Sequence, residues 1–295
     1  YRAKMDESWT PNESAYRRFA PPLAAPDREN DDDRLERARR VCAVPDVFAP
    51  LLPMLSPQRP VVDRERAQRT LIAEAERLRA EDPAQAAAMY NQIGTVLVGQ
   101  GDLASRELAL RMFRAAAEAG GDARAEILAR RMLGQRTEDS EASGHWRRII
   151  ELTDAMPPQT LREVRNEREI ALRESAWVER RAGRLDAAIA LRDQLLDEAH
   201  TSPAMLVEPP MCAQLRVENA RDYAMLGRID EALREYDRVL EEHPSYAEYG
   251  ASVFLRYERL QARGLGLTDP ERLAELESIW NDAALSARHP VEVST

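Results

Sequence analysis

Residues 220–244 read ARDYAMLGRIDEALREYDRVLEEHP, and they decide the fold class of this chain. A small residue, Ala220, precedes the turn glycine Gly227 by seven positions, and a second small residue, Ala232, follows that glycine by five. A small side chain in mid-helix lets two helices pack closely, and glycine readily adopts the left-handed backbone on which a helix ends. The stretch therefore predicts two antiparallel helices that cross at their alanines.

The same spacing recurs at two earlier turns. Gly94 precedes Gly101 by seven residues, Ala176 precedes Gly183 by seven, and Ala188 follows Gly183 by five. Self-similarity of this kind is the sequence signature of a helical-repeat array. The last two turn glycines are 44 residues apart, against about 34 in a regular array, so we predict an uneven superhelix.

The recurring positions closely resemble the tetratricopeptide repeat (TPR). In the last unit they are Ala220, Tyr223, Gly227, Ala232, Tyr236 and Pro244. An earlier stretch resembles the related Sel1-like repeat at Tyr90, Gly94, Gly101, Ala109, Phe113, Ala116 and Gly120. The unit around Gly183 departs from the pattern, because Glu179 and Arg192 stand where the repeat has aromatic residues. We expect these two opposite charges to pair in place of ring packing.

From Val62 onwards, apolar residues recur at three- and four-residue spacing between short Gly, Pro and Asp breaks. We predict an all-α fold, an irregular α-solenoid of stacked antiparallel helical hairpins preceded by a Pro-rich extended N-terminal segment. The predicted helices cover residues 62–80, 83–100, 103–119, 121–134, 142–155, 158–182, 185–200, 210–226, 229–242, 245–263 and 268–286. The predicted domains are a Pro-rich arm with short helices over 1–61, TPR/Sel1-like repeats over 62–264, and a C-terminal capping helix with a short tail over 265–295.

The N-terminal arm holds nine of the eighteen prolines, a density that favours extended backbone. We predict one short helix over 34–42, and a second apolar stretch over 47–55. Large apolar side chains in the arm are candidate anchors, which pack either on the chain's own solenoid or on a neighbouring subunit. These anchors are Trp9, Tyr16, Phe19, Phe48 and Leu51.

The composition favours a folded helical chain outside the membrane. The residues are 44% hydrophobic and 32% charged but only 5% aromatic, with a mean hydropathy of -0.55. No stretch approaches the roughly 20 apolar residues of a spanning helix, so we expect no direct membrane insertion. The net charge of -10 repels a nucleic-acid backbone, so we expect no nucleic-acid partner.

Several enzyme classes are disfavoured because Lys4 is the only lysine in the chain. A phosphate-binding P-loop, a pyridoxal enzyme and a protein kinase each need a lysine at a defined position. The use of arginine for nearly all positive charge is typical of a high-GC genome, which we take to be bacterial. No GxSxG, HExxH or paired-glycine fingerprint occurs, and nothing singles out a pair of catalytic carboxylates. We therefore expect no catalytic residues, no cofactor and no enzymatic activity.

Histidine and cysteine spacing gives no metal site. His145, His243 and His289 are scattered, and we expect each on the surface or at a helix end. Residues 197–200 spell the helicase letters DEAH, but without a phosphate loop we interpret them as the polar end of a helix. We expect Cys42 and Cys212 to be free thiols and the chain to be cytoplasmic rather than periplasmic. A single bridge between them would need an oxidising compartment.

In the TPR family, the first helix of each hairpin lines a concave surface that binds extended peptides or partner helices. Carried over by position, this resemblance implies a groove. Its residues are Arg173, Trp177, Arg180 and Arg181 from one unit, and Val217, Arg221, Ala224 and Met225 from the next. Arginine beside tryptophan is typical of a binding hot spot. The alternative is that the arginines form a solvated face and Trp177 belongs to the core.

Two further expectations concern the ligand of this groove. Trp177 and Val217 stand where carboxylate-clamp TPR domains have an asparagine and a lysine, so the resemblance does not support that activity. We expect an acidic or mixed peptide instead. Our first functional hypothesis is a non-catalytic protein–protein interaction scaffold, an accessory or assembly subunit with one or more protein partners. The alternative is a reversible peptide-binding regulatory or chaperone-like adaptor, and an RNA-binding helical repeat comes third because of the negative charge.

Overall fold

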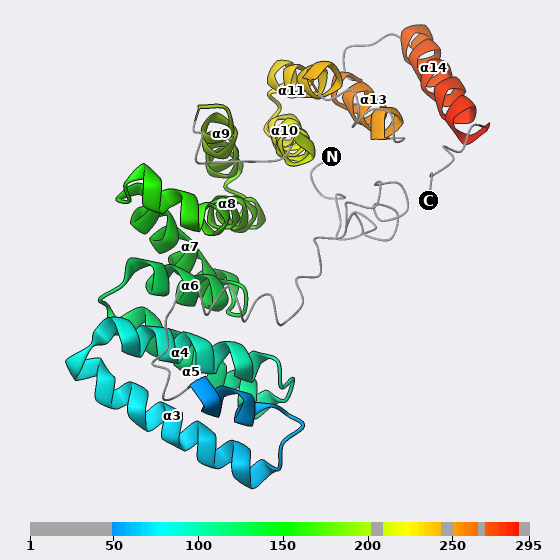
Figure 1. Ribbon diagram of the computed structural model, residues 1–295. Helices are drawn as coiled ribbons and strands as arrows, with labels where there is room; N and C mark the ends of the chain where they lie inside the picture. Colours follow the sequence, from blue (N-terminus) through cyan, green and yellow to red (C-terminus); the bar gives the residue numbers. More distant parts are fainter. Residues whose placement is uncertain (1–48, 202–208, 243–250, 265–268, 289–295) are drawn as a thin grey trace. The chain divides into compact units, whose positions relative to one another are not determined.

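A computed structural model describes residues 49–201, 209–242, 251–264 and 269–288 (Figure 1). These residues form helices, and no strand occurs among them. The elements are η1 (Ala49–Leu55), α3 (Val61–Glu81), α4 (Pro83–Val98), α5 (Leu103–Ala119), α6 (Ala123–Gly134), α7 (Asp139–Asp154), α8 (Pro158–Arg181), α9 (Leu185–Thr201), α10 (Pro209–Met225), α11 (Ile229–Glu242), α13 (Ala251–Arg263) and α14 (Asp269–Arg288). None of these helices combines the length and apolarity that a membrane crossing requires.

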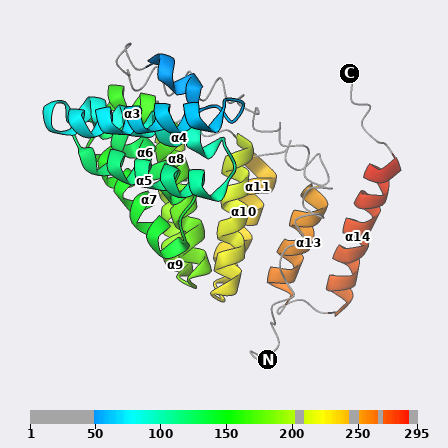
Figure 2. The same ribbon diagram turned by 90° about the horizontal axis from the view of Figure 1, so that it is seen from below.

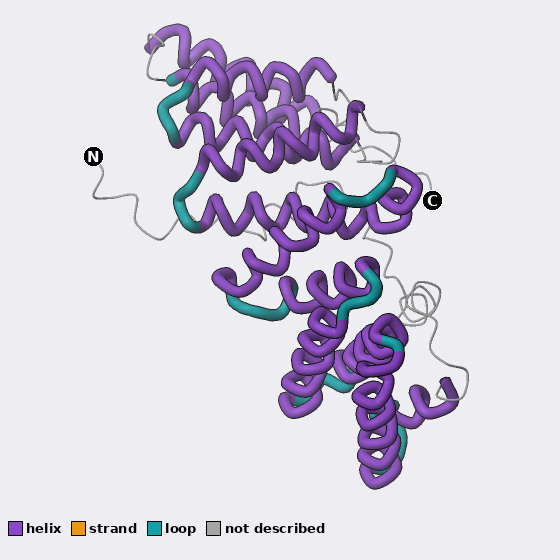
Figure 3. Tube along the Cα trace, turned by 90° about the vertical axis from the view of Figure 1, so that its left-hand side faces the viewer, coloured by secondary structure: helices purple, strands orange, loops and turns teal. Residues whose placement is uncertain are grey.

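The described helices fall into two compact units. The N-terminal unit contains η1 and α3 to α8, and the C-terminal unit contains α9 to α14. In the N-terminal unit each helix from α3 to α8 packs on the next (Figure 1), and α6 also contacts both α4 and α8. Figure 3 shows the described residues as helices joined by loops. Because the turns between neighbouring helices are short, consecutive helices pack as antiparallel pairs. The predicted all-α fold of stacked helical hairpins is confirmed.

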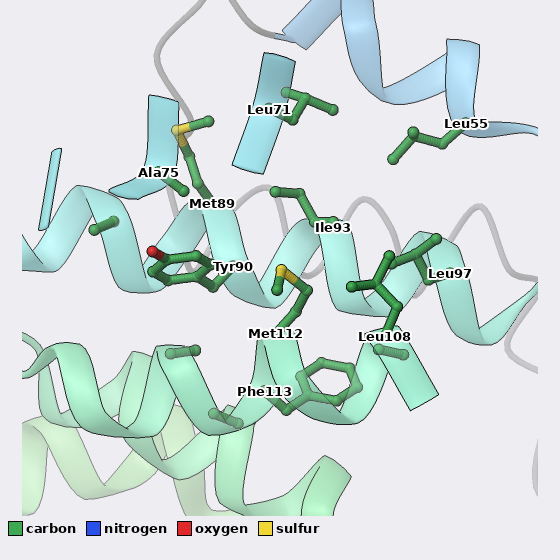
Figure 4. Packing of buried hydrophobic residues seen from close by; sticks show 14 of the residues in the cluster. Leu55, Leu71, Ala75, Met89, Tyr90, Ile93, Leu97, Leu108, Met112 and Phe113 are labelled. Atoms are coloured by element: carbon green, nitrogen blue, oxygen red, sulfur yellow. The ribbon is translucent and has the colours of Figure 1, made fainter. Parts of the chain in front are cut away.

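The larger apolar cluster of the N-terminal unit lies between α3, α4 and α5 (Figure 4), and a second cluster lies between α6, α7 and α8. Leu71, Met89 and Phe113 are buried in the larger cluster, one from each of its helices. A Cβ atom built on Gly94 of α4 would lie 2.8 Å from the Phe113 ring of α5. This confirms that a small residue at position 94 is needed for close packing of the two helices.

The predicted turn glycines adopt the left-handed backbone. The φ angle is +80° at Gly101, +76° at Gly183 and +75° at Gly227. The small residues that flank the last two turns are buried, with Ala176 1% exposed and Ala220 fully enclosed. The repeat spacing in the sequence therefore had the physical cause that we inferred for it.

Aspartate side chains cap the starts of two helices. Asp82 accepts a hydrogen bond from the Gln85 amide at 3.1 Å at the start of α4, and Asp102 accepts one from the Ser105 amide at 2.9 Å at the start of α5. The main boundary error is α7, which begins at Asp139 rather than at 142. Asp139 and Glu141 in its first turn stabilise the positive end of the helix dipole, a signal that our prediction underweighted. In the N-terminal arm, the predicted helix over 34–42 lies outside the described residues.

In the C-terminal unit, α10 packs on α11, α11 on α13 and α13 on α14 (Figure 2). Helix α10 is buried on most of its circumference, because charged as well as apolar side chains are enclosed. Ala213, Val217 and Ala220 contribute to the apolar core, while Asn219 and Asp222 are also fully enclosed.

Candidate protein-binding surface

The predicted tryptophan lies on the last turns of α8 and is exposed. Trp177 keeps 47% of its surface open, so the alternative that it belongs to the core is wrong. Its helix neighbours Ala176 and Val178 are buried, which shows that α8 turns its apolar stripe inward and leaves Trp177 outside that stripe. A large aromatic side chain is therefore presented to solvent at a defined place in the N-terminal unit.

Arg181 holds the Trp177 ring in place. The Cζ atom of its guanidinium lies 4.4 Å from the centroid of the ring, within cation–π range. The same guanidinium forms an ion pair with Asp139, at 3.2 Å between Nη1 and Oδ2, and so ties α8 to the first turn of α7. Such a contact at an exposed site contributes about 0.5–1 kcal/mol. The ring is thus partly ordered before any partner arrives.

Arg173 lies one turn before Trp177 on the same face of α8. Its guanidinium is 3.6 Å from Glu169 and 3.9 Å from Glu174, both on α8, and its side chain is one third exposed. Arg180 is partly buried. We refer to Arg173, Trp177, Arg181 and Asp139 as the α8 surface. It presents an aromatic ring between two arginines that already have carboxylate partners.

The other predicted groove residues lie on α10, in the C-terminal unit. Met225 is 63% exposed. Val217 is buried in the core, so the interpretation of its side chain as part of an open groove is wrong. The α8 and α10 residues belong to different units, and a continuous groove between them stays a prediction.

Arg221 of α10 takes part in a contact between helices. Its guanidinium binds both carboxylate oxygens of Glu258 on α13, at 2.9 Å from Nε and 2.8 Å from Nη2. The Tyr236 hydroxyl of α11 donates to the same carboxylate at 3.2 Å. Burial raises the pKa of Tyr236 well above its usual range, which keeps the hydroxyl protonated as a donor. The Glu258 carboxylate therefore joins α10, α11 and α13. The role of Arg221 in ligand binding stays a prediction.

Of the predicted N-terminal anchors, only Leu51 is described. It is partly buried on η1 and packs against the core of its own unit, beside the buried Leu52 and Leu55. Leu51 thus follows the first of the two alternatives, packing on the chain's own helices. The other four anchors, Trp9, Tyr16, Phe19 and Phe48, lie outside the described residues.

A buried polar network between α9 and α10 was missed. Arg192 is 1% exposed, and it donates to Asn219 Oδ1 at 2.9 Å and to Asp222 Oδ2 at 2.7 Å. Asn219 in turn donates to Asp193 at 2.7 Å. The signal was present, because Arg192 takes the place of a core aromatic residue, but its partners lie 27 and 30 residues away. The expected pairing of Arg192 with Glu179 stays a prediction.

Two of the histidines can be compared with their predictions. His200 is exposed at the end of α9, as expected for the DEAH stretch. His145 is different, because it lies in the middle of α7 with only 13% of its side chain exposed, so the predicted surface or helix-end position is wrong. Within the ranges that the structure describes, no three His, Cys, Asp or Glu side chains are grouped so that they could hold a metal ion. Cys212 is buried on α10, and Cys42 lies outside these ranges.

Three features of the described helices determine the fold class. Neighbouring helices are paired, small residues are buried where the helices cross, and the turn glycines are left-handed. The chain folds as stacked antiparallel helical hairpins, the arrangement that the TPR resemblance implies. No protein-family model matches the sequence, and no curated protein matches it significantly. Among solved structures, it is similar to the crystal structure of a Podosopora anserina protein described as a kinesin light chain with nearly identical TPR-like repeats. The identity is 16%, the TM-score is 0.42, and the match covers 75% of this chain and 96% of that chain. We carry no binding property over from that protein.

Proposed function

We propose that this chain is a non-catalytic protein–protein interaction scaffold, an accessory or assembly subunit of a larger complex. A stack of helical hairpins offers side chains along extended helix faces, and such faces suit the binding of other proteins. The proposal rests on one observation above all, the exposed and pre-oriented ring of Trp177 on the α8 surface.

The α8 surface has the residue types that dominate binding energy in protein interfaces. Tryptophan and arginine are enriched among hot-spot residues, and truncation of such a residue costs 2 kcal/mol or more, as an order of magnitude. An aromatic ring that is already held by a cation loses little conformational entropy when a partner covers it. We therefore expect Trp177 to be the anchor of the interface.

The experiment is native co-purification of the tagged full-length chain followed by mass spectrometry. Trp177→Ala should lose the principal partner by at least about tenfold, while circular dichroism and the melting curve stay unchanged. Leu103→Ala is the matched control, since Leu103 is 73% exposed on α5, outside the α8 surface. Equal recovery of the partner by both variants would remove the support that Trp177 gives to the proposal.

The second candidate function is a reversible peptide-binding adaptor, and the Arg181–Asp139 pair favours it. Both side chains of this pair are about half exposed, at 57% and 43%, so a carboxylate of an acidic peptide can replace Asp139 without burying a charge. An adaptor releases its partner when excess free peptide is added, whereas an assembly subunit stays bound through washing. Arg181→Gln should weaken the binding of an acidic peptide, but it should have a smaller effect on the binding of a partner through a large apolar interface.

The N-terminal arm belongs to this proposal as a second attachment point. The structure determines where to cut, because Leu52 and Leu55 of η1 are buried against the helices. A chain that begins at residue 49 should therefore keep its fold and lose only the partners that depend on the arm. Unchanged co-purification after this deletion would count against the arm.

A further inference from the structure

His145 of α7 has an unusual environment for a helix residue. Both ring nitrogens are enclosed and neither has a hydrogen-bond partner. The nearest acceptor is Glu141, one turn earlier on α7, with 3.5 Å between Nε2 and Oε1. A neutral imidazole tolerates this enclosure, whereas an imidazolium would require a partner for its charge.

The charged groups that face the ring come from three helices. Glu141 lies on α7 itself, Arg114 faces the ring from α5, and Arg130 faces it from α6. Arg114 donates from Nη2 to Oε1 of Glu141 at 2.9 Å, which is the same oxygen that lies nearest to His145. Arg114 and His145 therefore compete for one acceptor atom.

The remaining ionic contacts of α7 and of its neighbours do not involve the His145 ring. Glu126 of α6 accepts from Arg130 at 2.7 Å and from Arg148 at 3.1 Å. From α8, Arg181 reaches Asp139 in the first turn of α7, and Arg168 reaches Thr153 and Asp154 in the last turn. Glu141 is thus the carboxylate available to His145.

Burial and the two arginines oppose protonation of the ring. Burial is the largest cause and lowers the pKa of His145 below its usual range, with Arg130 and Arg114 acting in the same direction. The hydrogen bond from Arg114 lowers the pKa of Glu141. At neutral pH the ring is neutral, and Glu141 is ionised and bound to Arg114.

We propose that His145 is a proton-sensitive latch on the contact between α5 and α7. When the ring takes up a proton from solvent, Nε2–H donates to Glu141 Oε1 and displaces Arg114. The added positive charge lies between two arginines and repels both. Arg114, at 46% side-chain exposure, turns out to solvent, and the ion pair between α5 and α7 opens. Mild acid thereby loosens the link between α5 and α7 without unfolding the remainder of the stack.

The test is an NMR titration of the His145 ring in the full-length chain and in three variants. Arg114→Gln removes the competitor and should raise the pKa of His145, while Glu141→Gln should lower it. Arg79→Gln is the matched control, because Arg79 of α3 is also about half exposed and pairs with Glu118 of α5, which is not among the groups that face His145. The same pKa of His145 in Arg114→Gln and Arg79→Gln would overturn the latch, since a ring that is merely buried does not respond to its competitor.

Hydrogen exchange provides an independent measurement of the loosening between α5 and α7. After correction for intrinsic exchange rates, amides of α5 and α7 should lose protection between pH 7.5 and pH 5.5, up to about tenfold for each unit by which the pKa of His145 is lowered. His145→Gln should not show this loss. An equal pH dependence in the wild type and in this variant would contradict the proposal.

Discussion

At the scale of single residues, the glycines of α4 and α7 have opposite roles although both lie inside helices. Gly94 faces the Phe113 ring, and a Cβ there would approach it to 2.8 Å. A Cβ on Gly144, in contrast, would have no neighbour within 4 Å. The sequence marked Gly94 through its place in the repeat, but only the packing shows that Gly144 serves no close contact.

We therefore expect alanine to act in opposite directions at these two sites. Gly94→Ala should destabilise the chain by up to about 2 kcal/mol, because overpacking costs about 1–3 kcal/mol against a gain in helix propensity of about 1 kcal/mol. Gly144→Ala should stabilise it by up to about 1 kcal/mol. Chemical denaturation of both variants measures the two effects. A stabilising Gly94→Ala would mean that Phe113 can move aside.

Asp193 gives a prediction on pH dependence. Asp193 is exposed as a residue, but partial desolvation of its carboxyl raises its pKa above the ordinary value of 3.8, with a further contribution from Glu235. The folded chain therefore binds this proton more tightly than the unfolded chain does. The cost of the charge is fully present above the folded-state pKa and disappears as the pH falls toward 3.8.

Asp193→Asn should accordingly be slightly more stable than the wild type at pH 7.5, because it removes a partly desolvated charge near Glu235 and keeps an acceptor for Asn219. The gain should be small, since the Asp193 residue as a whole is exposed and water screens its charge. This advantage should shrink as the pH is lowered toward 4, since the wild-type carboxyl then becomes neutral as well. Urea unfolding at both pH values measures the difference. An advantage that stays constant with pH would show that the carboxylate is not the cause.

At the scale of helices, the sequence predicted most elements within one or two residues. The bounds of α5 and α11 agree with the prediction, since Asp, Gly and Pro mark helix ends through local chemistry. Partners across helices could not be predicted in this way. Arg221 binds Glu258 at a separation of 37 residues, and spacing within one helix does not say which faces meet. For the same reason, the sequence allows Trp177 either an exposed or a core position.

The buried network between α9 and α10 makes a prediction on this scale. Arg192→Leu takes one charged donor away from the enclosed Asp222 and Asn219, which should destabilise the chain by about 3–5 kcal/mol. The double variant Arg192→Leu with Asp222→Leu removes both charges and should lose less than the sum of the two single variants. A thermal or urea double-mutant cycle measures this coupling.

A matched exposed arginine checks that the loss comes from burial rather than from charge. Arg238 pairs with Glu235 at 2.8 Å, but 52% of its side chain is exposed, so Arg238→Gln should have little effect. Additive losses in the cycle, or equal losses for Arg192 and Arg238, would mean that the network does not hold the two helices together.

At the scale of the whole molecule, removing the N-terminal arm as far as its predicted boundary should lower the stability of the chain. The predicted arm extends to residue 61, but Leu52 is 5% exposed and Leu55 is fully enclosed in the core of the N-terminal unit. Each buried leucine contributes about 1.5–3 kcal/mol. The arm can therefore be removed up to the start of η1, but η1 itself must be kept.

A chain that begins at residue 49 should melt like the full-length chain, while one that begins at residue 61 should lose about 3–6 kcal/mol for the two leucines. Differential scanning fluorimetry and urea denaturation of the two truncations measure this. Equal stability of both truncations would show that η1 packs too loosely to matter.

The contrast between two tryptophans equips the chain with its own optical reporter. Trp146 is sealed against Gly134 at 2% exposure, whereas Trp177 is open to water beneath a guanidinium. The difference in emission between the wild type and Trp177→Phe should be red-shifted and readily quenched by acrylamide. A partner that covers the α8 surface should move this difference to the blue, so docking can be followed without any added dye.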